Sequence, residues 1–264
     1  MALQLNNAVD TARTAAEHNV IDLRDHRREH YKPWPSVTVV VPTRNEAANL
    51  PYVLPHIPNW VDEVLIVDAE STDGTVDVAL GLLPDARVII EPRKGKGVAL
   101  TTGFENATGE MIVAIDADGS TDPREIPAFV GALLAGADLA KGSRFIQGGG
   151  TDDMEFHRML GNRMLKFTVN RLFRGRYTDL CYGYFALRRS ALPQLITDLD
   201  DASGFEIETF LNIRALKNQL AITEVASFEF DRIHGTSNLN AFRDGLRILR
   251  VIVREWFDRG PRRQ

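Results

Sequence analysis

The chain has 264 residues, of which 44% are hydrophobic and 25% are charged, and its formal net charge is −5. This length and composition are typical of a globular protein with one full core, and the negative charge argues against nucleic acid as the main partner. A single cysteine, Cys181, excludes an internal disulfide. No signal pattern and no apolar run near the roughly eighteen residues that span a bilayer is present, which predicts a soluble, cytoplasmic protein.

Residues 1–35 are polar and charge-dense, and they end in Pro33, Trp34 and Pro35. We expect an N-terminal extension with one or two short helices here, followed by a single domain over residues 36–264. The domain begins with buried strands predicted at 37–41, 61–67, 86–90 and 111–115, each followed by a polar loop and a helix. Strands that alternate with helices indicate an α/β fold, a parallel sheet with helices on both faces.

The second half has a less regular pattern. The three glycines within Ile146 to Asp153 predict a mobile loop over the site. The other elements that we expect are a helix at 126–134, a helix at 155–173, a strand at 182–187, a helix at 204–217, a strand pair within 221–230 and a final helix that contains Phe242 and Trp256.

Two carboxylates, Asp116 and Asp118, follow the most apolar of these strands. In open α/β sheets ligands bind at the carboxyl edge, and two acids at this spacing suit a hard divalent cation such as Mg²⁺ or Mn²⁺ held against a substrate phosphate. The alternative is that both are turn residues before a helix cap at Thr121 to Pro123, which Asp-Gly and Asp-Pro chemistry also explains.

Polar loops at four strand ends, after Pro42, Asp68, Lys94 and Asp116, converge at one edge of such a sheet. Asp68 and Glu46 can accept hydrogen bonds from a base or ribose, and Arg44 and Lys96 can meet negative charge. Each side chain also has a structural interpretation: Asp68 as a helix cap, Glu46 as compensation of a helix dipole and Lys96 as a solvated charge. Because all four strand ends are polar, we interpret them together as a nucleotide-diphosphate site.

Common nucleotide-binding motifs are missing. No Gly-x-x-x-x-Gly-Lys-Ser/Thr and no Gly-x-Gly-x-x-Gly follows a strand, so neither a P-loop nucleotidase nor a dinucleotide dehydrogenase is supported. A sugar nucleotidyltransferase needs a glycine-rich first loop, and Pro42 to Glu46 is not glycine-rich.

Five segments, in order, resemble the inverting family 2 glycosyltransferases of GT-A fold, and most of all the dolichyl/polyprenyl-phosphate mannose synthase branch. They are Pro42 to Glu46, Val67 to Thr75, Asp116 to Asp118, Gly142 to Phe145 and Arg232 to Ser237. The resemblance implies a Rossmann-like mixed sheet. It also implies metal-dependent transfer of a hexose, mannose or glucose, from a GDP- or UDP-sugar.

The resemblance also implies roles for single residues. Pro42, Asp68 and Ala117 belong to nucleotide-sugar motifs, Asp116 and Asp118 to a Mg²⁺ or Mn²⁺ site on the diphosphate, and Arg144 lies near phosphate as a catalytic group. Ser120 stands where the branch usually has a metal-ligating Gln.

The acceptor side departs from the branch. Arg232, His234 and Ser237 lie where it has a phosphate-binding Arg-x-x-Gly-x-Ser-Lys, but Asn238 replaces the lysine. Arg158 and Asn162 match the arginine-containing helix after the loop and are placed on the acceptor side. The acceptor is therefore a polyprenyl phosphate or a small molecule.

A phosphate acceptor is already an anion and needs no base, whereas a hydroxyl acceptor needs a carboxylate. Glu206 and Glu208 are the catalytic candidates, and at i, i+2 they cannot both point inward from one helix face. Two other functions stay open: a non-catalytic nucleotide-sugar-binding protein and a nucleotidyltransferase.

The last helix carries an apolar stripe beside a basic one. The stripes are Phe242, Leu246, Leu249, Val253 and Trp256, and Arg243, Arg247, Arg250 and Arg254. This pattern suits a helix at an anionic lipid surface, peripheral at the inner face of the membrane. It also suits a helix that packs its stripe on the domain or in a homodimer, as the further apolar residues Ile248, Val251 and Ile252 would indicate.

Overall fold

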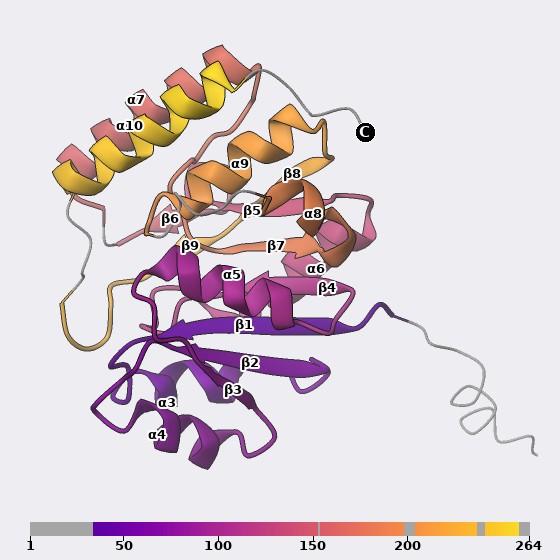
Figure 1. The fold of residues 1–264 in the computed structure, drawn as a ribbon, viewed down its shortest axis with the longest axis vertical. Coiled ribbons are helices and arrows are strands. Elements are labelled where there is room, and N and C mark those ends of the chain that lie inside the picture. Colours follow the sequence, from indigo (N-terminus) through magenta and orange to yellow (C-terminus); the bar gives the residue numbers. More distant parts are fainter. Residues whose placement is uncertain (1–33, 153, 198–203, 237–240, 259–264) are drawn as a thin grey trace, which may run out of the picture. The chain divides into compact units, whose positions relative to one another are not determined.

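The structure, a computed structural model, describes residues 34–152, 154–197, 204–236 and 241–258. The short helices expected before Pro33 lie outside these residues. Residues 36–264 cluster into one compact unit. In the part of this unit that is described, the main sheet has seven strands in the order β3-β2-β1-β4-β7-β5-β8 (Figure 1).

The predicted helices and strands are present, with boundaries shifted by a few residues, but the strands Leu139–Ser143 and Gly150–Thr151 and the helix Leu192–Leu195 were not predicted. The strands are β1 (Val37–Thr43), β2 (Glu63–Asp68), β3 (Arg87–Ile90), β4 (Met111–Ala114), β5 (Leu139–Ser143), β6 (Gly150–Thr151), β7 (Phe185–Arg188), β8 (Ile222–Ala226) and β9 (Phe228–Glu229). The helices are α3 (Leu50–Val53), α4 (Thr75–Leu82), α5 (Lys96–Asn106), α6 (Ile126–Leu134), α7 (Phe156–Phe173), α8 (Leu192–Leu195), α9 (Ile207–Lys217) and α10 (Ala241–Phe257). Short 3₁₀ turns lie at Leu54–His56, Pro123–Glu125 and Arg189–Ala191.

Strand direction explains where a site can form. Strands β1 to β4 are parallel, so their carboxyl ends lie at one edge of the sheet, as predicted. Strand β7 is antiparallel to both β4 and β5, which makes the sheet mixed. The α/β architecture with a mixed sheet is therefore confirmed.

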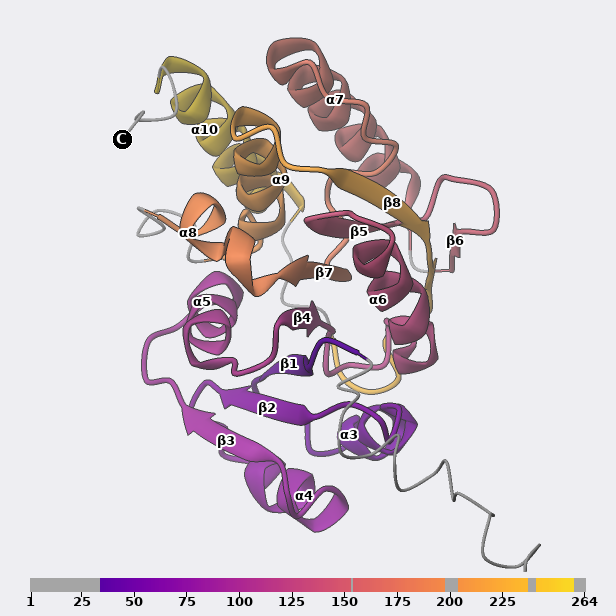
Figure 2. The same cartoon turned by 90° about the vertical axis from the view of Figure 1, so that its right-hand side faces the viewer.

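Alternating side chains of the buried strands build two cores. In β1, Val40 faces a core shared with α5 and α9, whereas Val39 and Val41 face a core shared with α3, α4 and α6. Figure 2 shows these two helical layers on opposite sides of the sheet. Because both faces are covered, the strands read as continuous apolar runs rather than as alternating ones.

The described part of the glycine-rich segment, which we expected to be a mobile loop at Ile146 to Asp153, is paired with another strand in this structure, and its mobility stays a prediction. Strand β6 pairs with β9, and the amide of Asp152 donates to the carbonyl of Glu229 at 2.9 Å. A Cβ on Gly150 would lie 2.5 Å from the ring of Phe228, and one on Gly149 would overlap the carbonyl oxygen of Ser143. These glycines therefore permit close packing, a role that composition alone does not distinguish from flexibility. Asp153 itself lies outside the described residues.

Helix α10 buries a different face from the predicted apolar stripe. Ile248, Val251 and Ile252 are at most 7% exposed and belong to the core that includes α9, whereas Phe242 is 79% and Trp256 47% exposed. The interpretation that the stripe packs on the domain is therefore wrong. Among the described residues, no helix is long and apolar enough to cross a membrane.

We predict that Gly149→Ala lowers the free energy of unfolding by about 1–3 kcal/mol, because the new methyl group must displace backbone atoms. Urea denaturation measures the change. Gly131→Ala is the matched control: it lies in α6, where an added Cβ would meet no atom of the surrounding fold within 4 Å, and it should be neutral or stabilising by up to about 1 kcal/mol. Equal stability of Gly149→Ala and wild type would contradict the packing role.

Candidate active site

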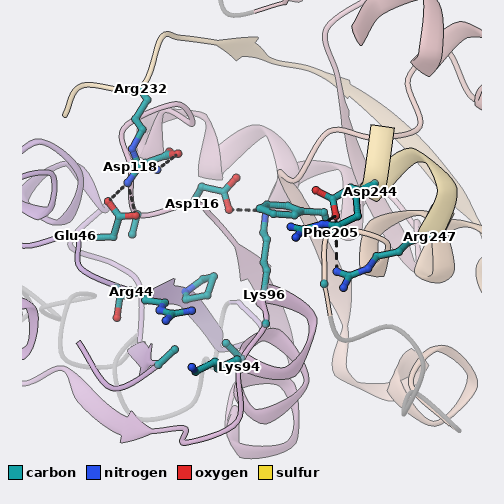
Figure 3. Close-up of a pocket in the computed structure, with 18 residues that line it drawn as sticks. Arg44, Glu46, Lys94, Lys96, Asp116, Asp118, Phe205, Arg232, Asp244 and Arg247 are labelled. Carbon is teal, nitrogen blue, oxygen red and sulfur yellow. Dashed lines mark hydrogen bonds and ion pairs between the residues drawn. The ribbon is translucent and has the colours of Figure 1, made fainter. Parts of the chain in front are cut away.

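A cavity of about 610 Å³ opens at the carboxyl edge of the parallel strands (Figure 3). The loops after β1, β2, β3 and β4 all contribute to it, as the convergence of strand ends predicted. The start of α10 and the turn before α9 form the opposite wall. Its charged lining residues are Arg44, Glu46, Lys94, Lys96, Asp116, Asp118, Arg232, Arg243, Asp244 and Arg247.

Lys96 links two carboxylates from distant parts of the chain. Its Nζ lies 2.7 Å from Oδ1 of Asp116 and 3.0 Å from Oε1 of Glu208. Burial disfavours the ammonium form, but the attraction of Asp116 and Glu208 outweighs it and raises the pKa of Lys96. Burial raises the pKa of Asp116, partly offset by Lys96. The alternative interpretation of Lys96 as a solvated charge is therefore wrong, since its side chain is 16% exposed and bridges two carboxylates, and its contact with a nucleotide sugar stays a prediction.

Gly183, just before β7, leaves the space that this bridge occupies. A Cβ at this position would lie 2.6 Å from Nζ of Lys96, 3.0 Å from Oδ2 of Asp116 and 3.2 Å from Oε1 of Glu208. Any larger residue would push the three charged groups apart. In the sequence this position shows only as a single glycine between Tyr182 and Tyr184. No turn follows that would account for a glycine.

Asp118 is oriented by the residue that replaces the usual Gln of the branch. The amide and hydroxyl of Ser120 donate to Oδ1 of Asp118 at 3.0 and 2.7 Å. The guanidinium of Arg232 donates to Oδ2 at 3.0 Å. In this structure Ser120 therefore orients the carboxylate of Asp118.

Arg232 also reaches across to the loop after β1. Its Nη2 lies 2.5 Å from Oε1 of Glu46, and Asn49 donates to Oε2 of the same carboxylate at 2.6 Å. Burial lowers the pKa of Arg232, but the pairing with Glu46 and Asp118 dominates and raises it. Asn49 exchanges hydrogen bonds with the backbone of His234, whose ring packs on Tyr52 at 5.7 Å. His234 does not line the cavity, whereas Arg232 does.

These contacts set the charge and the oxygen donors that a bound divalent metal ion would meet. Glu46, Asp116, Asp118 and Glu208 share the two cations Lys96 and Arg232, which is a surplus of two negative charges in this group. The described residues contain no cluster of three or more His, Cys, Asp or Glu side chains that could hold a metal ion. A divalent cation bound by two carboxylates, with phosphate and water oxygens as its other ligands, is the usual arrangement for Mg²⁺. The hard oxygen donors of Asp116 and Asp118 fit this arrangement.

Arg44 and Lys94 are exposed at the rim of the cavity, while Pro42 and Ala117 form part of its wall (Figure 3). Asp68 is placed differently from the prediction. It is 1% exposed, and its carboxylate accepts hydrogen bonds from Thr43 and from the amide and hydroxyl of Ser71. In this structure Asp68 braces two loops of the site and does not line the cavity.

Arg144 is held by buried carboxylates. Its guanidinium is bound to Asp179 at 2.6 and 2.9 Å and to Glu229 at 2.8 Å, and it stacks on Tyr182 at 4.9 Å. Burial opposes its charge, but the pairing with Asp179 raises its pKa, and that of Asp179 is lowered. Arg144 also borders a cavity that Asp116 and Asp118 line, and its predicted catalytic contact with phosphate stays a prediction. Arg144 joins β5 to β9 and thereby holds one wall of the site.

The two glutamates at the start of α9 point in different directions, as their spacing predicted. Glu208 pairs with Lys96. Glu206 accepts the amide of Gly204 at 3.0 Å, and it does not line either of the two larger cavities. Glu208 is therefore the glutamate of the pair that the structure brings to the site.

A second cavity, of about 550 Å³, shares Lys96, Asp116 and Asp118 with the first and extends toward α7. Arg158 lines it, as does Asn162, which donates to Asp179 at 2.9 Å. Predicted acceptor residues Arg158 and Arg232 thus border the same cavity. Ser237, the remaining acceptor candidate, lies outside the described residues.

Sequence reasoning missed Phe205, Asp244 and Gly183. The ring of Phe205 lies 5.9 Å from Nζ of Lys96, and Asp244 borders both cavities from the first turn of α10. The sequence offered one signal for Asp244, an aspartate among the arginines of an amphipathic helix, and the structure buries it to 2% exposure. Phe205 gave none.

Comparisons with known sequences identify a matching family and similar proteins. A profile described as glycosyl transferase family 2 matches residues 38–196, more than half of the chain. A polyprenol monophosphomannose synthase of Mycolicibacterium smegmatis is 32% identical over 240 residues, which is 87% of this chain and 89% of that protein. A dolichol-phosphate mannosyltransferase of Pyrococcus furiosus is 33% identical over 166 residues, 59% of this chain and 47% of that one.

Solved structures show the same fold. A glucosyl-3-phosphoglycerate synthase from Mycobacterium tuberculosis, in complex with Mn²⁺, uridine diphosphate and glucosyl-3-phosphoglycerate, has a TM-score of 0.66 at 24% identity. The match covers 86% of this chain and 81% of that chain. The same synthase in complex with phosphoglyceric acid has a TM-score of 0.67 at 25% identity, with equal coverage.

We predict that Lys96→Met lowers the free energy of unfolding by about 3 kcal/mol, because it leaves Glu208 and Asp116 close together without compensation. Urea denaturation measures the loss. Lys94→Met, two residues earlier and exposed, should change stability by less than about 0.5 kcal/mol. Adding Glu208→Gln to Lys96→Met should recover much of the loss, and a Lys96→Met variant as stable as wild type would refute the bridge.

Proposed function

The chain belongs to glycosyl transferase family 2, and we propose that it transfers mannose or glucose from a nucleoside diphosphate sugar to an acceptor with inversion. The observation that carries this proposal is the pair Asp116 and Asp118 at the end of β4, facing a cavity that also holds basic side chains. Arg44, Lys94 and Lys96 supply the positive charge that a diphosphate requires. Single displacement at the anomeric carbon needs the acceptor on the face opposite to this diphosphate.

Asp116 and Asp118 are the residues that would hold Mg²⁺ or Mn²⁺, with Ser120 keeping Asp118 in position. The ion would supply charge neutralisation for the departing diphosphate. The complexes of the similar synthase with Mn²⁺ or Mg²⁺ and uridine diphosphate support such a site.

On the donor side, the first loop supplies Arg44 and Glu46 to the cavity, and Pro42 and Ala117 complete its wall. Asp68 acts through the loops that it braces. A guanine or a uracil base is compatible with these side chains, so the donor is a GDP- or UDP-hexose.

For the acceptor we favour a polyprenyl phosphate. The similar polyprenol monophosphomannose synthase covers most of this chain, and Arg232 and Arg158 border the second cavity, where they can bind a phosphate. The phosphate is the nucleophile in this reaction and needs no base. Glu208 then acts by holding Lys96 in the site.

A small phosphorylated acceptor is the second candidate, supported by the fold shared with a synthase that binds phosphoglyceric acid. An acceptor that reacts through a hydroxyl group needs a general base, and Glu208 is a carboxylate that lines the second cavity. The two candidates differ in solubility and in the group that attacks, which makes them separable by experiment.

A transfer assay tests the proposal. We expect purified protein with Mg²⁺ or Mn²⁺ to release a nucleoside diphosphate from GDP-mannose or UDP-glucose and to glycosylate polyprenyl phosphate rather than 3-phosphoglycerate. Release of pyrophosphate from a sugar phosphate and a nucleoside triphosphate would indicate a nucleotidyltransferase instead. Donor binding without any product would indicate a non-catalytic nucleotide-sugar-binding protein.

Asp118→Asn should abolish most transfer while the protein stays folded, because an amide is a poor ligand for a hard cation yet keeps the acceptor for Ser120. We expect kcat/KM to fall by at least about a hundredfold, the scale of one lost charge-stabilising group. Thermal unfolding should change little. Asp77→Asn, on α4, is the control and should retain wild-type kinetics. Near-normal turnover of Asp118→Asn with metal present would refute the assignment.

A further inference from the structure

Helices α7 and α10 expose large apolar side chains to solvent. We call this set the α7–α10 surface: Phe156, Leu160, Met164 and Phe167 from α7, and Phe242, Leu246, Leu249, Val253, Trp256 and Phe257 from α10. Each of these residues is between 42% and 79% exposed. The two helices are in contact with each other, and large apolar side chains exposed on neighbouring elements usually mark a place of interaction.

The opposite faces of the two helices account for this exposure. Helix α10 is tied to α9 by Glu255, which is 1% exposed and pairs with Arg214 at 2.9 Å and Lys217 at 2.8 Å. Helix α7 runs alongside α10, and Phe173 meets Trp256 edge-on at 5.8 Å (Figures 1 and 2). Both helices are therefore fixed on the domain by one face while the apolar stripes stay outside.

The charge of these two helices is opposite to that of the chain. They contain eight Lys and Arg residues, whereas the whole chain has a net charge of −5. Helix α7 has no Asp or Glu, and the two acids of α10, Asp244 and Glu255, are buried. The exposed members of the basic set are Arg163, Arg171, Arg243, Arg247 and Arg250.

We propose that the α7–α10 surface binds the face of an anionic lipid bilayer. Apolar side chains flanked by arginine can enter the interface while the guanidinium groups stay at the level of anionic headgroups. A second copy of the chain would have to place these basic helices against each other, which like charge opposes. Charge complementarity therefore selects the lipid surface over a homodimer.

The second cavity lies next to the two helices that form this surface. The cavity is bordered by His157 and Arg158 of α7, by Gly245 and Ile248 of α10, and by Asp116 and Asp118. A bilayer bound to the same two helices would therefore lie beside the cavity to which we assign the acceptor phosphate. This role of the surface rests on the proposed function, but the binding of the bilayer does not.

Vesicle sedimentation without donor or acceptor tests the binding alone. We expect the full chain to sediment with vesicles of phosphatidylcholine and phosphatidylglycerol, to sediment at least about tenfold less with phosphatidylcholine alone, and to be released by added salt. The double variant Phe167→Ser, Phe242→Ser should lose at least about tenfold in affinity, and so should Arg163→Gln, Arg171→Gln, Arg250→Gln.

The matched control is Trp60→Ser, Ile90→Ser, which removes two exposed apolar residues outside the α7–α10 surface and should bind like wild type. Circular dichroism and nucleotide-sugar thermal shifts establish that each variant is folded. Absence of sedimentation at low salt would overturn the proposal, as would equal binding by the α7–α10 variants and the control. A lipid-free dimer that Phe167→Ser, Phe242→Ser converts to a monomer in light scattering would also overturn it. Failure of transfer with intact vesicle binding would refute the proposed function instead.

Discussion

Charge compensation at the end of β4 is the constraint on which the site depends. Asp116 and Asp118 stand close to Glu208 and Glu46, and carboxylates in partly buried positions repel one another unless cations separate them. Lys96 and Arg232 provide this separation, Lys96 from the helix that precedes β4 and Arg232 from a segment 114 residues after Asp118. The first turn of α5, the loop after β9 and the start of α9 are thereby tied to a single strand end.

The architecture followed from the sequence because it rests on local patterns. Runs such as Val37 to Val41 are long, β-branched and followed by polar loops, so strand, loop and sheet edge could each be predicted. The partners of individual side chains could not be predicted in the same way. Arg144 in Gly-Ser-Arg-Phe reads the same whether it meets a phosphate or, as here, Asp179 and Glu229, because the partners lie 35 and 85 residues away. Asp68 was ambiguous because a carboxylate at a strand end can meet a ligand or cap a nearby loop, and in this structure it accepts hydrogen bonds from Ser71, three residues later.

The glycines and the last helix show a second limit of sequence patterns. Three consecutive glycines are equally consistent with chain freedom and with close packing, and only the neighbours Phe228 and Ser143 distinguish the two. In α10 the apolar residues form two sets, and periodicity does not tell which set faces the domain. The less regular set, with Ile248 and Ile252, is buried, which leaves the regular stripe for an external partner.

The order of strands in the sheet also bears on how the chain assembles. Strand β5 pairs with β7 and β8 and has no ladder with β4, the strand that precedes it in sequence. The first four strands and their helices can form ladders as soon as they are synthesised, whereas β5 waits for residues near 185 and 222. Pairings of such sequence separation close large loops and are slow. During synthesis the amino-terminal half thus presents an unpaired edge at β4 until β7 arrives, and the wall that carries Gly183 and Glu208 is completed last.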